Sequence, residues 1–170
     1  MSAPASITVR FAESRDLPQI LAFIRELAEY EKLAHEVSAD VDALEASLFG
    51  AMPAAEVLLA EVDGESAGFA LFFHNFSTFL GRRGLYLEDL YVSPRFRGHG
   101  LGRRLMTSLA RIAVERGCGR FEWSVLDWNA PAIGFYRSLG AVGMDEWTVQ
   151  RVCGDALQDL ARDSELPGRS

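Results

Sequence analysis

A chain of 170 residues, 49% of them apolar and 24% charged, has the size and composition of one soluble globular domain. Its apolar runs, such as residues 67–73, are strand-sized, which argues against a membrane span. The net charge of −7 argues against general nucleic-acid binding and fits a small cationic substrate. Residues 1–7 lack the basic start and long apolar stretch of a secretion signal, so we expect a cytoplasmic protein.

The cysteines and histidines are few and scattered. Cys118 and Cys153 are too far apart for a zinc spacing and too few for a disulfide framework. The three histidines, His35, His74 and His99, have no partner at a metal-ligand spacing. We therefore expect no metal cofactor.

The first half of the chain is typical of a strand, two helices and a hairpin. A helix begins near Pro18, where apolar residues start to recur at helical spacing and continue to Ala28. Asp63 and Gly64 favour a tight turn between two alternating stretches. The expected elements are a strand at 7–11, a helix from about 16, a shorter helix at 38–49, and hairpin strands at 56–62 and 66–76.

The second half predicts a strand, a glycine-rich loop, a helix and a further strand, which together form a βαβ crossover. Asn129 suits a helix N-cap and Gly140 suits a helix C-terminus. The expected elements are strands at 85–92 and 120–126, a helix at 129–139, one or two closing strands to about Val152, a weak helix at 155–162 and a loose end at 167–170. The order predicts an α+β chain with a mixed sheet.

Residues 97–102, which we call the glycine loop, read Arg-Gly-His-Gly-Leu-Gly and directly precede a helix. The first turn of a helix leaves backbone N–H groups without partners and carries partial positive charge, so this loop suits a phosphate group. A nucleotide P-loop would need a lysine where Arg103 stands. A dinucleotide fingerprint would space its glycines as GxGxxG, whereas this loop has GxGxG, so it is a distant second choice.

The glycine loop resembles the pyrophosphate loop of the GCN5-related N-acetyltransferase (GNAT) superfamily, whose pattern is Arg/Gln-x-x-Gly-x-Gly/Ala after a strand. More narrowly, the chain resembles the diamine (spermidine/spermine) N-acetyltransferase branch of that superfamily. The residues that carry this second resemblance are Tyr30-Glu31, Tyr86-Leu87-Glu88-Asp89, Trp128-Asn129-x-Pro131, Phe135-Tyr136 and Gly140-Ala141.

The resemblance implies a GNAT fold, in which a mixed, mostly antiparallel twisted sheet of six to seven strands is flanked by helices and splayed at the acetyl-CoA site. It implies a single N-acetyltransferase domain at 1–153 and a partly helical tail at 154–170. We expect this tail to lie at the interface of a homodimer. The implied co-substrate is acetyl-CoA.

Acetyl transfer needs a neutral amine, yet an amine of pKa ~10.4 is only about 0.04% neutral at pH 7, worth ~4.6 kcal/mol. Glu88 and Glu31 are the acidic candidates for removing this proton, with Glu31 acting through a water relay. The resemblance assigns the removal to Glu88 and protonation of the leaving CoA thiolate to Tyr136. Strand alternation predicts that Glu88 shares a face with Leu90 and Val92 and lies opposite Asp89, unless a bulge shifts the register. We therefore expect a structural role for Asp89.

The resemblance also implies the contacts with acetyl-CoA. The backbone of residues 90–92 is expected to bond the pantetheine arm as if it were an added strand and to donate to the oxyanion. The glycine loop is expected to hold the pyrophosphate, with Arg103 or Arg104 near its charge. The expected cofactor-binding residues are Leu90, Tyr91, Val92, Arg97, Gly98, His99, Gly100, Leu101, Gly102, Arg103, Asn129 and Tyr136.

We expect the acceptor amine at Tyr30, Glu31, Glu88 and Glu122, because carboxylates near an aromatic ring suit an alkyl-ammonium group. The leading hypothesis is an N-acetyltransferase that acts on a small diamine-like or polyamine-like acceptor in a ternary complex. Two alternatives stay open. One is acetylation of thialysine, an amino acid or a peptide amine, and the other is a non-catalytic acyl-CoA-binding module.

Overall fold

The computed structural model describes residues 5–166, which divide into two compact units, one up to Ser124 and one from Val125. No helix among the described residues is both long and apolar enough to cross a membrane. The elements of the first unit are β1 (Ile7–Phe11), η1 (Ser14–Asp16), α1 (Leu17–Tyr30), η2 (Ala34–Glu36), α2 (Val41–Phe49), β2 (Glu56–Val62), β3 (Glu65–Ser77), β4 (Arg82–Val92), η3 (Pro94–Phe96), α3 (Leu101–Glu115) and β5 (Phe121–Trp123). The second unit contains α4 (Ala130–Ser138) and α5 (Gly154–Arg162).

The five strands form one sheet in the order β1-β2-β3-β4-β5. All neighbouring pairs are antiparallel except β4 and β5, which are parallel and joined through α3. The predicted hairpin is confirmed, because β2 and β3 meet at Asp63 and Gly64, whose φ angles are 52° and 81°. Left-handed backbone at both turn positions is what a two-residue hairpin requires. The predicted βαβ crossover and the α+β class are confirmed as well.

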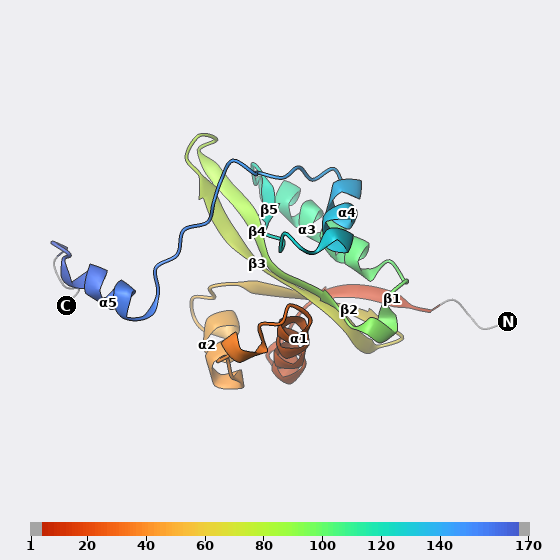
Figure 1. Ribbon diagram of the computed structural model, residues 1–170. Coiled ribbons are helices and arrows are strands. Elements are labelled where there is room, and N and C mark those ends of the chain that lie inside the picture. The colour runs from red at the N-terminus through yellow and green to blue at the C-terminus, as the bar shows by residue number, and fades with distance from the viewer. Residues whose placement is uncertain (1–4, 167–170) are drawn as a thin grey trace. The chain divides into compact units, whose positions relative to one another are not determined.

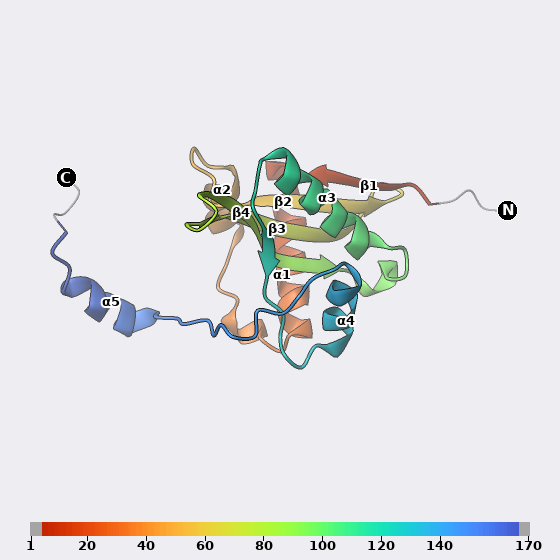
Figure 2. The same ribbon diagram turned by 90° about the horizontal axis from the view of Figure 1, so that it is seen from above.

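Helices cover both faces of the sheet. Figure 1 shows α1 and α2 on one face and α3 on the other, and in Figure 2 α3 lies across the strands, in agreement with its contacts to β1, β2, β3 and β4. On the α1 face, the ring of Phe23 stacks on Phe69 with centroids 5.7 Å apart and lies 5.9 Å from that of Tyr91. On the other face, α3 buries Leu105 and Leu109 completely, as the helical spacing predicts.

A β-bulge interrupts β4 at Glu88. Leu87 pairs with Phe72 of β3, but the next pair along is Asp89 with Leu71, so Glu88 is an extra residue without a partner on β3. Leu71 packs on the core beneath α1, and directly paired residues share a face, so Asp89 lies on the α1 side. The bulge thus separates Leu87 and Asp89, which a regular strand would place on one face.

The sheet has five strands in the described part of the chain, fewer than the six to seven that we expected. The strand expected at 120–126 is only three residues long, and residues 141–152 form no strand. Apolar residues at a spacing of two, such as Trp147 and Val149, are typical of a strand. A strand also needs a neighbour to bond, and none pairs with this segment among residues 5–166.

Both helices of the second unit were predicted. Asn129 is the N-cap of α4, and its side chain accepts a hydrogen bond from the backbone N–H of Ala132 at 3.3 Å. The weak helix expected at 155–162 is confirmed as α5, although the loose end expected at 167–170 lies outside the described residues. A single domain at 1–153 stays a prediction.

Candidate active site

The glycine loop leads into the first turn of α3 with backbone that only glycine adopts easily. Gly98 and Gly100 have φ angles of 85° and 73°. Gly100 is the N-cap of α3, so no side chain satisfies the first N–H groups of the helix. The N–H groups of Leu101, Gly102 and Arg103 therefore face an exposed loop with the positive end of the helix dipole behind them, which fits a pyrophosphate.

Side chains of the same loop hold it to β4 and η3. The Nε of Arg97 donates to the carbonyl oxygen of Val92 at 3.3 Å, and the guanidinium carbon of Arg97 lies 5.7 Å from the ring centroid of Tyr30. The Nδ1 of His99 lies 3.1 Å from the carbonyl oxygen of Phe96. Because Arg97 is exposed at the start of the loop, its remaining N–H groups can reach a phosphate.

The sheet opens beside the end of β4. The strand β5 pairs with β4 only from Leu85 to Leu87, so no strand accompanies residues 88–92 on that side among the residues described. On its other side, the same stretch pairs with β3. This is the splay that the resemblance implied, and it leaves backbone groups of residues 90–92 able to bond an extended chain such as pantetheine.

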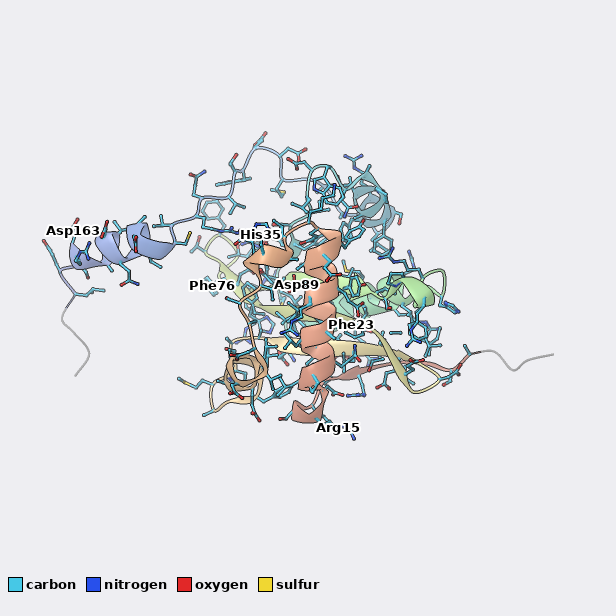
Figure 3. All side chains as sticks on the ribbon, turned by 60° about the horizontal axis from the view of Figure 1, so that its bottom comes forward. Arg15, Phe23, His35, Phe76, Asp89 and Asp163 are labelled. Atoms are coloured by element: carbon cyan, nitrogen blue, oxygen red, sulfur yellow. The ribbon has the colours of Figure 1, made fainter. Side chains whose placement is uncertain are left out.

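An open acidic pocket of about 390 Å³ lies between α1, the loop after it and the bulge of β4. One face of α1 supplies its apolar wall, with Ile24, Leu27 and Ala28 at helical spacing, and Glu31 continues that face by one turn. Glu88 and Asp89 enter from β4, and Glu36 enters from η2. In Figure 3, Asp89 lies at α1, in the region between Phe23 and the turn that carries His35.

The carboxylates of the pocket repel one another. Burial, the charge of Glu88 and the charge of Glu31 raise the pKa of Asp89 to about 6. Burial also raises the pKa of Glu31 above its ordinary value. A cation entering the pocket would relieve this repulsion, so the pocket is suited to an ammonium group.

The structure corrects the predicted orientation of Glu88. Alternation places Glu88 on the face of Leu90 and Val92 and opposite Asp89, but both carboxylates line the same pocket because the bulge adds a residue between the two pairing registers. The sequence gives no direct signal of this bulge, since it depends on the pairing with β3. Asp89 and Glu36 are therefore pocket residues that sequence reasoning missed.

The other predicted acceptor residues lie elsewhere. Tyr30 contacts Arg97 of the glycine loop and is not among the residues that line the pocket. Glu122 forms a salt bridge with Arg120 at 2.6 Å and accepts a hydrogen bond from the Nδ2 of Asn75 at 3.2 Å. Of the four predicted acceptor residues, the structure brings Glu31 and Glu88 together.

Two predicted residues, Asn129 and Tyr136, belong to the second unit. Asn129 caps α4, and the ring of Tyr136 lies 5.4 Å from that of Phe135. Asn129 thus fills the capping role that its position at the helix start favoured. The contacts of Asn129 and Tyr136 with acetyl-CoA stay predictions.

Comparison with known proteins decides the family. The model of the acetyltransferase (GNAT) family matches residues 21–141. This chain belongs to the GNAT acetyltransferase family. It is an N-acetyltransferase that uses acetyl-CoA as co-substrate, and the glycine loop and opened sheet fit that co-substrate.

Two curated relatives and one solved structure are similar to this GNAT enzyme over most of its length. It is 40% identical to the thialysine N-epsilon-acetyltransferase of Mus musculus, over 92% of this chain and 98% of the relative. It is 31% identical to the spermidine/spermine N(1)-acetyltransferase-like protein 1 of Homo sapiens, over 90% of this chain and 23% of that longer protein. An integron cassette protein of V. cholerae has the same fold, with a TM-score of 0.78 and 28% identity over 93% of this chain and 99% of that one.

The raised pKa of Asp89 predicts a pH-dependent gain of stability in Asp89→Asn. Below about pH 4, the pKa of Asp89 in the unfolded chain, Asp89 is protonated in both states and its burial costs no stability. As the pH rises through about 6, Asp89 ionises in the folded protein, and this stability is lost. Asp89→Asn should therefore raise the free energy of unfolding by about 1–2 kcal/mol at pH 7.5, because a full pKa unit is worth ~1.4 kcal/mol and partial exposure reduces the sum.

Urea unfolding at pH 7.5 and pH 4 measures this gain, which should disappear at the lower pH. The matched control is Glu29→Gln, on an exposed part of α1, which should show no gain at either pH. An Asp89→Asn variant less stable than wild type at pH 7.5 would contradict the prediction, because it would show that the charged carboxylate stabilises the folded protein.

Proposed function

We propose that this enzyme acetylates the terminal primary amine of a small dicationic acceptor that binds in the acidic pocket. The observation that supports this most strongly is the lining of the pocket, where four carboxylates, Glu31, Glu36, Glu88 and Asp89, face an apolar wall. The carboxylates suit ammonium groups, and the apolar wall suits the carbon chain between them. The pocket adjoins the same strand, β4, whose end leads into the glycine loop.

Glu88 is the proposed proton acceptor. Like Glu36 it is exposed, and it lies on β4, the strand proposed to bind the thioester, so it can take a proton from the bound ammonium group and pass it to water. Asp89 and Glu31, which are more buried, hold the cation by charge. Loss of the proton leaves the amine nitrogen with a free electron pair for attack on a carbonyl carbon.

The transfer itself forms a carbon–nitrogen bond and breaks the carbon–sulfur bond of the thioester. The thioester of acetyl-CoA supplies the activated acetyl group. Backbone N–H groups within residues 90–92 are proposed to donate to the carbonyl oxygen as negative charge develops on it. Tyr136 is proposed to protonate the departing thiolate, a role that rests on the resemblance of its position in α4.

Two acceptor classes are favoured by different observations. The mouse relative is named for acetylating thialysine, an amino acid, which favours a diamino acid. The pocket lining contains acidic but no basic side chains, which favours a diamine or polyamine without a carboxylate.

We further propose a homodimer joined through the tail, because Leu157 and Leu160 of α5 are 47% and 62% exposed.

An acceptor panel tests this function. Release of free thiol from acetyl-CoA is measured with diamines, polyamines, diamino acids and a monoamine of equal chain length. A dicationic acceptor should have a kcat/KM at least about tenfold above the monoamine, because a second ammonium contact is worth ~1.4 kcal/mol or more in a partly buried site. Equal rates with the monoamine, or no thiol release with any amine, would contradict the proposal.

Glu88→Gln should lower kcat by about a hundredfold or more, because the amide cannot accept the proton, while acetyl-CoA affinity is unchanged. The comparison variant is Glu122→Gln, at a carboxylate that already pairs with Arg120. We expect it to retain near-normal kcat and acceptor KM. A normal kcat in Glu88→Gln together with a lowered kcat in Glu122→Gln would contradict the proposal and would place the acceptor near Glu122.

Tyr136→Phe should lower the rate of the chemical step by about a hundredfold and leave acetyl-CoA binding nearly unchanged, because only the hydroxyl is removed. Single-turnover kinetics with saturating acetyl-CoA measures that step. An unchanged turnover would remove Tyr136 from the proposed mechanism.

A further inference from the structure

The helix α1 presents two different faces to the two proposed binding regions. Ile24, Leu27 and Glu31 line the acidic pocket. Glu26 and Tyr30 lie four residues apart on another face, where Glu26 contacts β4 and Tyr30 contacts the glycine loop. The last two turns of α1 thus stand between the acceptor pocket and the loop proposed for pyrophosphate.

The contact with β4 is a hydrogen bond in a partly buried setting. The hydroxyl of Tyr91 donates to the Oε2 of Glu26 at 2.8 Å, and the ring of Tyr91 packs near Phe23. Burial and the hydrogen bond to Glu26 raise the pKa of Tyr91 to about 12, whereas the charge of Arg97 lowers it. Tyr91 thus ties α1 to β4 through Glu26.

The contact with the glycine loop is made by Arg97. Its Nε is bonded to the carbonyl oxygen of Val92, and its guanidinium lies over the face of the Tyr30 ring. An exposed arginine has many rotamers, so two contacts made by the same guanidinium restrict where it points. The ring contributes a flat surface and its quadrupole, both of which Phe would retain.

We propose that Tyr30 is a positioning residue for Arg97, and that α1 thereby ties the pyrophosphate loop to the acceptor pocket. This inference rests on the proposed use of the glycine loop for the pyrophosphate of CoA. It assigns Tyr30 to co-substrate binding through Arg97, in place of the direct acceptor contact expected from the sequence. Glu26 and Tyr91 support it by fixing α1 against β4.

The test is the affinity for CoA, measured by calorimetry without any acceptor. Tyr30→Leu should weaken CoA binding about three- to fivefold, in proportion to the loss of one exposed cation–π contact. Tyr30→Phe should bind CoA as wild type does. The matched control is Phe79→Leu, an aromatic residue fully exposed between β3 and β4, which should have no effect.

A double-mutant cycle with Arg97→Gln shows whether Tyr30 acts through the arginine. If it does, Tyr30→Leu has no further effect on CoA affinity in the Arg97→Gln background, and the KM of the acceptor amine is unchanged in Tyr30→Leu. Additive effects of the two substitutions would overturn the proposal, as would a raised amine KM with normal CoA affinity. Circular dichroism and thermal unfolding check that each variant is folded.

The outcomes separate this inference from the proposed function. Equal CoA affinity of the wild type and Tyr30→Leu overturns the role of Tyr30 and leaves the proposed function standing. Wild-type protein that does not bind CoA overturns the pyrophosphate site and the role of Tyr30 together. Normal CoA binding with no amine acetylated overturns only the proposed acceptor.

Discussion

The arrangement of the site depends on one extra residue in β4. A strand alternates its side chains between two faces, and Leu87 and Asp89 would share a face if β4 were regular. The bulge at Glu88 allows Leu87 to remain opposite Phe72 while Asp89 pairs with Leu71 on the α1 side. The insertion therefore keeps apolar residues in the core on both faces of the sheet, and it allows two adjacent carboxylates to line one pocket.

Two opposite electrostatic environments lie one after the other along the same strand, β4. At the bulge, Glu88 and Asp89 join Glu31 in a pocket that favours a cation. A few residues further on, β4 leads into η3 and the glycine loop, where the start of α3 favours an anion. A transferase for a cationic amine and an anionic co-substrate needs both environments within reach of one reacting bond, and β4 provides them in sequence.

Local signals in the sequence predicted much of this fold. Asp63-Gly64 predicted a hairpin turn, the glycine loop predicted the start of α3, and Asn129 predicted the start of α4, because each depends on a few neighbouring residues. The bulge and the length of β5 were not predicted, because both depend on the pairing between strands distant in the chain. The position of the glycine loop before α3 was accordingly predicted, whereas the direction that Glu88 faces was not, and the roles of the site residues stay predictions.

The account holds that β4 binds acetyl-CoA through the backbone after its bulge and the acceptor through the carboxylates at its bulge. A crystal structure with CoA and a diamine bound tests this most directly. It should show pantetheine bonded along residues 90–92, the pyrophosphate at the start of α3, and an ammonium group within hydrogen-bond distance of Glu88 or Asp89. Pantetheine away from β4, or the diamine outside the pocket with no contact to either carboxylate, would contradict the account.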